Sequence, residues 1–217
     1  MAGGVIVGGH RVDKPGTRVP EDAEISIKKG LRYVGRGGLK LEAALAAFGI
    51  DPTGAVCLDI GASTGGFTDC LLQHGAAKVY AIDVGHSQLD WKIRADPRVA
   101  VREKLNARNL TRADVPEAPA ICTIDVSFIS LTLILPPAFE VLSPMGVILA
   151  LIKPQFELGK NEVGRGGIVR DPAAHEAAVG KIRDFVTGVA GRKWEGVIES
   201  PILGGEGNKE FLACLRP

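Results

Sequence analysis

Short apolar runs alternate along most of the chain with segments whose apolar residues recur every three or four positions. Such runs predict strands buried on both faces, and the segments between them predict amphipathic helices that cover a parallel sheet. Seven strands are expected, within residues 55–61, 77–85, 98–105, 120–127, 146–154, 194–202 and 209–216. Helices are expected within residues 37–50, 65–75, 87–96, 131–142 and 171–191. The pattern therefore predicts an α/β fold with a doubly wound, mostly parallel sheet.

The two ends of the chain depart from this alternation. No helical segment separates the last two strands, so we expect an antiparallel hairpin at the edge of the sheet. Residues 1–30 contain short strands and turns rich in glycine, and a linker is expected over residues 28–36. We therefore divide the chain into a small front module, residues 1–30, and a main domain, residues 31–217.

A glycine-rich turn joins the first strand of the main domain to a helix, in the stretch CLDIGASTGGFTDCLL (residues 57–72). Its letters GASTG fit the G-x-S-x-G pattern in which a serine hydrolase carries its nucleophile, here Ser63. The same turn also suits a cradle for a small molecule, because glycines let the backbone approach a ligand and the first N–H groups of the helix face it.

A serine hydrolase needs more than this turn. An acid and a histidine must follow the nucleophile, and a separate loop must supply oxyanion donors. His74 and His86 lie close to the turn in sequence, and His175 precedes the last two strands. No glycine-rich oxyanion loop precedes the turn. The sequence thus favours a cradle over a nucleophile.

Acidic residues at the ends of two strands support the cradle. Asp59 ends the first strand of the sheet, and Asp83 ends the next one, 22 residues after Gly61. At this distance an acidic residue accepts hydrogen bonds from ribose hydroxyls in a βαβ unit. Ser63 replaces the second glycine of a dinucleotide fingerprint, which disfavours a pyrophosphate and hence NAD.

Composition narrows the class of protein. The 217 residues are 46% hydrophobic, enough for a buried core, and carry a net charge of +1. The longest apolar runs fall far short of the roughly 20 residues that cross a bilayer, and the start does not read as a secretion signal. The four cysteines are scattered and form no metal-type cluster with the four histidines. We expect a cytoplasmic protein without a bound metal or a membrane partner.

Five stretches of the main domain together resemble a known family: DIGASTGGFTDCLL, AIDVGHSQLDW, IDVSFISL, LIKPQFE and GGIVRDP. From about Tyr33 to its end, the chain resembles the TlyA (haemolysin A) branch of the FtsJ-like RNA methyltransferases. The resemblance implies a Rossmann-like domain that uses S-adenosylmethionine to methylate a ribose 2′-hydroxyl of ribosomal RNA, with cytidine as the expected nucleotide. A serine hydrolase and a haemolysin-like membrane-active protein stay open as alternatives.

The resemblance also implies roles for individual residues. The family's Lys-Asp-Lys-Glu set matches Lys40, Asp125, Lys153 and Glu210, which we expect to be catalytic. Asp125 and Lys153 also follow expected strands, at the sheet edge where ligands bind. The residues expected to contact the cofactor are Asp59, Gly61, Ala62, Ser63, Thr64, Gly65, Gly66, Phe67, Thr68, Asp83, Val84, Asn106, Ala107 and Asp125.

Two further expectations concern aromatic residues and a long loop. Phe67 and Trp91 could be aromatic residues that stack on nucleic-acid bases, but both occupy helical positions that face a sheet, so we expect both in the core. Residues 153–172 form a long, glycine-rich connection, which we expect to cover the RNA end of the cleft. Its cations are Lys153, Lys160, Arg165 and Arg170.

The front module resembles part of an RNA-binding fold. Residues 3–28 are similar to the second half of the fold of ribosomal protein S-four, whose opening helices have no counterpart in this sequence. Residues 1–40 hold eight Lys or Arg and four Asp or Glu, a balance of +4, whereas the remaining 177 residues hold 18 and 21. We therefore expect ribosomal RNA or ribosomal subunits as the partner, with weak and salt-dependent binding by this module.

Overall fold

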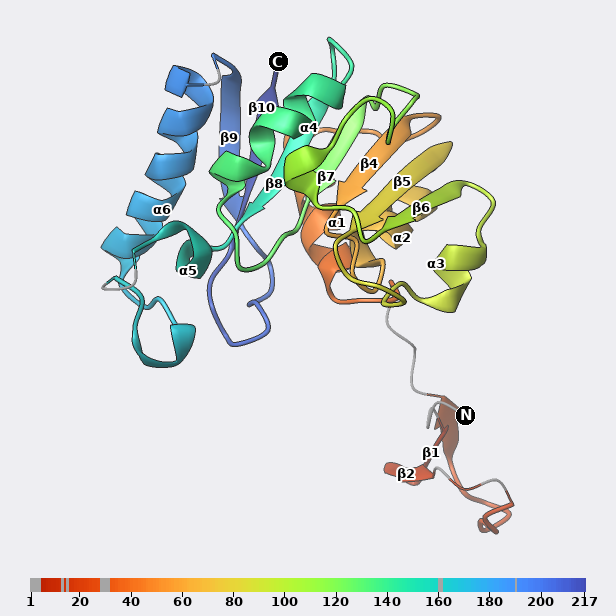
Figure 1. Ribbon diagram of the computed structural model, residues 1–217. Coiled ribbons are helices and arrows are strands. Elements are labelled where there is room, and N and C mark those ends of the chain that lie inside the picture. Colours follow the sequence, from red (N-terminus) through yellow and green to blue (C-terminus); the bar gives the residue numbers. More distant parts are fainter. Residues whose placement is uncertain (1–4, 13, 15, 28–31, 160–161, 190) are drawn as a thin grey trace. The chain divides into compact units, whose positions relative to one another are not determined.

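The computed structural model describes the whole chain except residues 1–4, 13, 15, 28–31, 160–161 and 190 (Figure 1). It divides into two compact units, Met1–Arg32 and Tyr33–Pro217. This boundary falls within the linker expected from the sequence, two residues after the predicted limit of the front module. The second unit holds the seven-stranded sheet and every residue predicted for a site.

The sheet has the strand order β6-β5-β4-β7-β8-β10-β9. The strands are β4 (Val56–Ile60), β5 (Lys78–Asp83), β6 (Val99–Glu103), β7 (Ile121–Ile124), β8 (Val147–Ile152), β9 (Lys193–Glu199) and β10 (Phe211–Arg216). Strands β4 to β8 pair in parallel, whereas β10 is antiparallel to both of its neighbours. The predicted fold class is confirmed.

The predicted hairpin of the last two strands is present, with one difference in detail. Strand β10 is not at the edge but lies between β8 and β9. The sequence of β10 explains this position, because its four central residues are all apolar and all buried. Strand β9 alternates between exposed and half-buried residues, as suits a strand at an edge.

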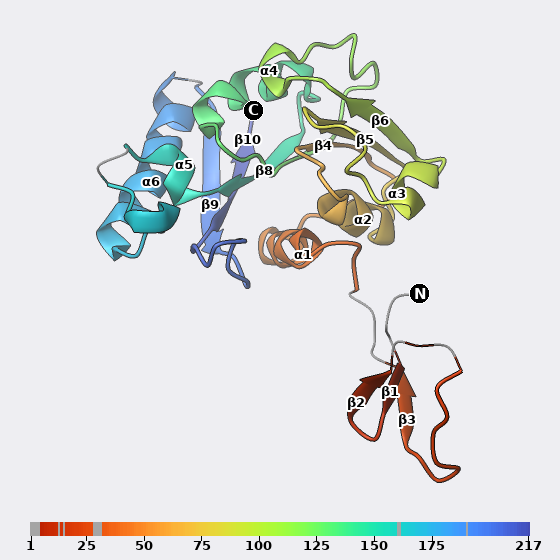
Figure 2. The same ribbon diagram turned by 60° about the horizontal axis from the view of Figure 1, so that its bottom comes forward.

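Helices cover both faces of the sheet (Figures 1 and 2). Helices α1, α2 and α3 pack on one face, and α4 and α6 pack on the other. The helices are α1 (Gly37–Phe48), α2 (Gly66–Gln73), α3 (Trp91–Ala95), α4 (Leu135–Val141), α5 (Pro154–Glu157) and α6 (Pro172–Asp184). Short helical turns are η1 (Ala107–Asn109), η2 (Leu131–Leu133), η3 (Arg165–Gly167) and η4 (Phe185–Val189). None of the helices in the described part of the chain is long and apolar enough to cross a membrane.

Two helices are shorter than the sequence pattern predicted. Helix α3 begins only at Trp91, because Asp90 is its N-cap and accepts a hydrogen bond from the backbone N–H of Lys92. It ends at Ala95 because Asp96, which precedes Pro97, is extended. The segment predicted as one helix over residues 131–142 is divided into η2 and α4. Pro136 and Pro137 lie in the first turn of α4, where a missing N–H group costs little.

The aromatic predictions had opposite outcomes. Phe67 of α2 is 3% exposed and belongs to the core, as predicted. Trp91 is 71% exposed, so its assignment to the core was wrong. Because α3 has only five residues, Ile93 is its only buried residue, and Trp91 at its start is left in solvent.

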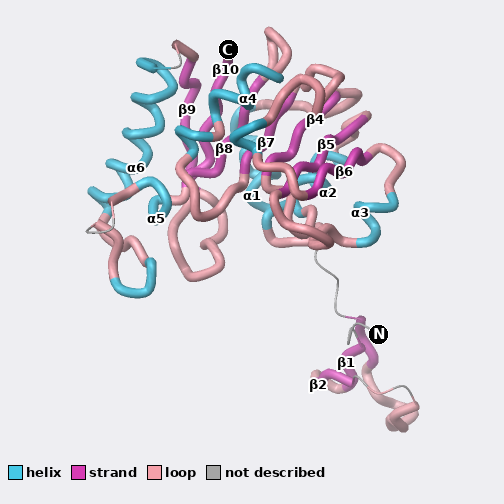
Figure 3. The backbone as a smooth tube through the Cα atoms, viewed as in Figure 1, coloured by secondary structure: helices cyan, strands magenta, loops and turns pink. Residues whose placement is uncertain are grey.

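The front unit contains a three-stranded antiparallel sheet in the order β2-β1-β3, and Figure 3 labels two of its strands, β1 and β2. Its strands are β1 (Val5–Val7), β2 (His10–Val12) and β3 (Ile25–Ile27). The strands and turns expected from the sequence are present. The likeness to ribosomal protein S-four stays a prediction.

Candidate active site and cofactor cleft

A cleft of about 770 Å³ opens at the carboxyl ends of β4, β5 and β7. The chain leaves β4 toward β5 on one side and later returns to β7 on the other, so the cleft lies where the strand order reverses. Open α/β sheets bind ligands at such a point. Residues that line the cleft include Gly61, Ser63, Asp83, Val84, Gln88, Asn106, Ala107, Arg108, Asp125, Ser127, Phe128 and Phe156. The volume suits a ligand of nucleoside size.

Gly61 is required at the centre of this cleft. Its φ is +84°, and a Cβ atom there would lie 2.2 Å from the carbonyl oxygen of Asp125. A side chain would therefore push the ends of β4 and β7 apart. The absence of a side chain keeps the glycine-rich turn against Asp125 and open to a ligand.

A smaller cavity of about 110 Å³ continues toward the start of α2. Its lining is Gly37, Gly61, Ala62, Ser63, Thr64, Gly66, Phe67 and Asp125. Gly66 begins α2, and the N-cap residue Gly65 provides no side-chain hydrogen bond to the first N–H groups. These groups at the helix N-terminus suit a carboxylate.

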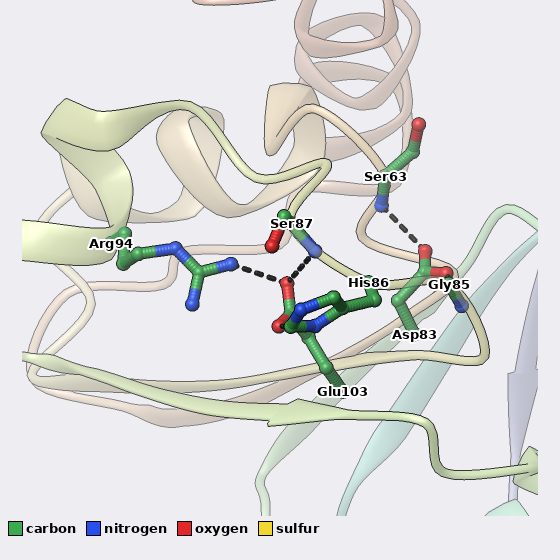
Figure 4. A network of polar contacts seen from close by, with 7 residues as sticks. All are labelled: Ser63, Asp83, Gly85, His86, Ser87, Arg94 and Glu103. Carbon is green, nitrogen blue, oxygen red and sulfur yellow. Dashed lines mark hydrogen bonds and ion pairs between the residues drawn. The ribbon is translucent and has the colours of Figure 1, made fainter.

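Asp83, at the end of β5, binds the backbone of the glycine-rich turn (Figure 4). One carboxylate oxygen accepts a hydrogen bond from the backbone N–H of Ser63 at 2.7 Å, and the other from Gly85 at 2.6 Å. Each oxygen has a second lone pair. The carboxylate can therefore also accept hydrogen bonds from a ligand in the cleft.

Glu103, on the neighbouring strand β6, holds the loop that follows Asp83 (Figure 4). One carboxylate oxygen accepts a hydrogen bond from the Ser87 backbone N–H at 2.8 Å and pairs with Arg94. The other lies 3.0 Å from Nδ1 of His86. These contacts hold in place the loop that contains Val84 and Gln88, two residues that line the cleft.

Asp59 occupies a different environment from Asp83. Its carboxylate is fully buried in β4 and accepts hydrogen bonds from the hydroxyls of Thr68, at 2.6 Å, and Thr123, at 3.0 Å. Burial raises the pKa of Asp59 to about 6, although the two hydroxyl groups oppose the shift. Asp59 thus ties α2 to β4 and β7 beneath the turn.

The raised pKa of Asp59 makes the stability of the fold depend on pH. A carboxyl whose pKa is higher in the folded protein than its ordinary 3.8 makes the fold progressively less stable between pH 3.8 and about 6, because the unfolded chain ionises in this range while the folded carboxyl keeps its proton. Asp59→Asn stays neutral at every pH. Relative to the unchanged protein, its free energy of unfolding is expected to improve by up to about 3 kcal/mol between pH 4 and pH 7. Urea denaturation of both proteins at the two pH values measures this, and a difference independent of pH would contradict it.

Eleven of the fourteen residues predicted to contact a cofactor line one of the two cavities. Val84, Asn106 and Ala107, predicted near an adenine, lie together in the larger one. Asp59, Gly65 and Thr68 do not line either cavity. Thr68 and Asp59 instead bond to each other, and Gly65 packs against Leu89.

Two of the predicted catalytic residues form an ion pair beside the cleft, which one of them, Asp125, lines. Nζ of Lys153, which follows β8, lies 2.6 Å from Oδ1 of Asp125, which follows β7. The same Nζ donates a hydrogen bond to the hydroxyl of Ser127 at 3.0 Å. The Lys153 side chain is 11% exposed and that of Asp125 22%, so a substrate can reach the pair.

The other two predicted catalytic residues form a second, more deeply buried pair. Nζ of Lys40 in α1 lies 2.5 Å from Oε2 of Glu210. Their side chains are 10% and 3% exposed. Phe211 of β10 pairs with Ile152 of β8, which places Glu210 and Lys153 at adjacent strand ends. The structure thus brings the four residues together as two pairs, on the side of the sheet where the parallel strands end.

Several cleft residues were not found from the sequence. Phe128 is 90% exposed, has a φ of +63° that L-residues seldom adopt, and lies 5.0 Å from the ring of Phe156, measured between centroids. Glu157 supports this wall by accepting hydrogen bonds from the Ser130 hydroxyl and the Leu131 N–H. The sequence signal was an aromatic residue three positions after Asp125, in IDVSFISL.

The serine at the centre of the turn lacks the partners of a nucleophile. Ser63 has a φ of +48°, as a strained turn requires. Within the described residues, the side chains of His74, His86 and His175 bond to other groups. None of them is paired with Ser63, so the geometry gives no support to a serine hydrolase.

The likeness suggested by the sequence extends over the whole second unit. A model of the FtsJ-like methyltransferase family matches residues 33–217. The 16S/23S rRNA (cytidine-2′-O)-methyltransferase TlyA of Mycobacterium tuberculosis is 43% identical over 99% of this chain and 81% of its own length. Hemolysin A of Brachyspira hyodysenteriae is 44% identical over 98% of this chain and 89% of its own length. A solved structure of a candidate hemolysin from Lactococcus lactis is 55% identical, with a TM-score of 0.83 over 86% of this chain and 89% of that chain.

Proposed function

The chain belongs to the FtsJ-like methyltransferase family, and from this membership we propose that it methylates a ribose 2′-hydroxyl of ribosomal RNA, at a cytidine, with S-adenosylmethionine as the methyl donor. One structural observation carries the proposal. The Asp125–Lys153 ion pair lies beside a nucleoside-sized cleft, which both Asp125 and Gly61 line. An rRNA substrate makes the cytoplasm the expected compartment.

The residues of the two cavities fit S-adenosylmethionine. The carboxylate of Asp83 suits the ribose hydroxyls, and the wall formed by Val84, Asn106 and Ala107 suits the adenine. The smaller cavity at the start of α2 suits the carboxylate of the methionine end. When bound, S-adenosylmethionine supplies an electrophilic methyl group on a sulfonium.

The Asp125–Lys153 pair suits the acceptor hydroxyl. In-line transfer requires a ribose oxygen that is held in place and that loses its proton. The Lys153 ammonium is a hydrogen-bond donor, so we assign it to holding this oxygen. Asp125 and Ser127 orient the ammonium through the contacts at 2.6 and 3.0 Å. A neutral Lys153 would instead accept the proton, and the dependence of the rate on pH distinguishes these two roles.

Phe128 gives the substrate side of the cleft a surface for a nucleobase. A flat ring that is 90% exposed, backed by Phe156 and adjacent to Ser127, can stack on the base of the acceptor nucleotide. An acceptor ribose can reach the ion pair only if its nucleotide leaves the surrounding stack. We assign Phe128 to holding that nucleotide.

The cofactor assignment is tested by the affinity for S-adenosylmethionine. Asp83→Ala is expected to weaken binding by roughly 1 to 3 kcal/mol, the usual range for hydrogen bonds to a charged group. Ser63→Ala is the matched control, because Ser63 meets Asp83 through its backbone N–H and keeps this bond. Calorimetric titration of both variants measures the effect. Equal affinities for Asp83→Ala and the unchanged protein would refute the assignment.

A further inference from the structure

Positive charge in the main domain is concentrated in one short segment. Residues 92–112 contain seven Lys or Arg and two Asp or Glu. Outside this segment and residues 1–40, the remaining 156 residues contain 11 Lys or Arg and 19 Asp or Glu. The rest of the main domain is therefore acidic. The seven cations are Lys92, Arg94, Arg98, Arg102, Lys104, Arg108 and Arg112.

These cations lie at one end of the sheet, on α3, β6 and the turn η1 or in the chain segments next to these elements. Strand β6 is the edge strand next to β5, and α3 packs beside it (Figures 1 and 2). All seven residues are exposed. We name this surface the α3–β6 basic edge.

Most of this charge is not neutralised. Arg94 pairs with Glu103, and Arg98 pairs with Asp96. The other five cations have no ion pair within the described residues. Lys104 follows β6 directly and has no carboxylate partner there, so its charge faces solvent.

The opposite edge of the sheet provides a comparison. Cations often protect an edge strand against pairing with another chain, and this alone would explain a basic edge. At the β9 edge, however, Lys193 and Arg216 both pair with Glu195, and Arg183 of α6 pairs with Asp184. Protection of an edge thus does not require the excess positive charge found along β6.

The α3–β6 basic edge is continuous with the cleft. Arg108 belongs to both, because it lines the cleft together with Asn106 and Phe128. Trp91 adds an aromatic surface that is 71% exposed, with Nζ of Lys92 6.0 Å from its ring centroid. Unpaired cations beside an exposed aromatic ring match the phosphates and bases of a nucleic acid strand.

We propose that the α3–β6 basic edge binds the phosphates of the RNA on one side of the acceptor nucleotide, with Trp91 stacking on a base of that strand. The proposal rests on RNA being the substrate. It gives the main domain an RNA-binding surface of its own, in addition to the front unit, which was expected from its charge to bind RNA.

The test compares two double variants that remove equal charge from the two edges of the sheet. Arg102→Ala/Lys104→Ala changes the proposed surface, and Arg183→Ala/Lys193→Ala is the matched control. Filter binding of purified ribosomal RNA is measured at two salt concentrations. The first variant is expected to bind roughly tenfold more weakly at low salt, with the slope of log affinity against log salt reduced by about 2, since each lost phosphate contact contributes about 1. Trp91→Ala is expected to bind roughly fivefold more weakly.

Calorimetric titration with S-adenosylmethionine is performed on every variant and is expected to give unchanged affinity, which shows that the cleft is folded. Equal RNA affinity of the two double variants would overturn the role of the basic edge and leave the proposed function intact. Absence of RNA binding by the unchanged protein, with S-adenosylmethionine still bound, would overturn both the RNA substrate and this surface.

Discussion

Lys153→Ala is expected to slow methyl transfer at saturating cofactor by roughly 10²- to 10³-fold, the range for loss of one hydrogen-bond donor to a reacting oxygen. The substitution removes the group that holds the acceptor oxygen and leaves Asp125 without its partner at 2.6 Å. Affinity for S-adenosylmethionine is expected to be unchanged, because the ammonium is assigned to the acceptor and not to the cofactor. Transfer of a radiolabelled methyl group measures the rate, and calorimetry measures the affinity.

A second lysine of the same domain provides the control for this variant. Lys78 of β5 pairs with Glu117 at 2.5 Å, and the two side chains are 34% and 53% exposed. Lys78→Ala removes an equal charge and an ion pair but touches neither cavity. Its rate is expected to be close to that of the unchanged protein. If Lys153→Ala turned over as fast as Lys78→Ala, another group would hold the acceptor.

Breaking the buried pair of Lys40 and Glu210 is expected to have the largest effect on stability. Lys40→Met leaves the Glu210 carboxylate, 3% exposed, without a partner charge. Removal of one member of a buried ion pair typically lowers the free energy of unfolding by about 3 to 5 kcal/mol. Guanidinium denaturation followed by circular dichroism measures the loss. A change below about 0.5 kcal/mol, the usual size for a surface substitution, would contradict the burial of this pair.

The double variant Lys40→Met/Glu210→Leu separates a structural from a catalytic role. With both charges removed, no buried group is left unpaired, so most of the lost stability is expected to return. If the pair acts on the substrate, as the family match implies, methyl transfer stays impaired in the restored protein. Recovery of both stability and rate would show that the pair only supports the fold.

The sheet could be predicted from the sequence because its strands are apolar runs of the length that a buried parallel strand requires. The run VILALI became β8, with all six residues buried. The place of β10 inside the sheet was not predicted, although its apolar residues on both faces contained the signal. The exposure of Trp91 follows from its place at the start of α3, next to the N-cap Asp90, which helical spacing alone does not show.

The site could be predicted only where a motif fixes the backbone. Gly61 and Asp83 followed from the spacing of a βαβ unit, and the structure places both in the cleft. Lys40 and Glu210 are 170 residues apart, so no local pattern shows that they meet, and the family match named both residues but not their contact. The exposure of Phe128 follows from a backbone conformation that its sequence neighbours do not reveal.

Nucleoside analysis after methyl transfer tests the central claim most directly. The protein is incubated with isotopically labelled S-adenosylmethionine and unmodified ribosomal RNA, as free transcript and in ribosomal subunits, and the RNA is then digested and examined by mass spectrometry. We expect the label in 2′-O-methylcytidine, and a Lys153→Ala sample without it. Label on a nucleobase, or no label in any nucleoside of either substrate, would contradict the account.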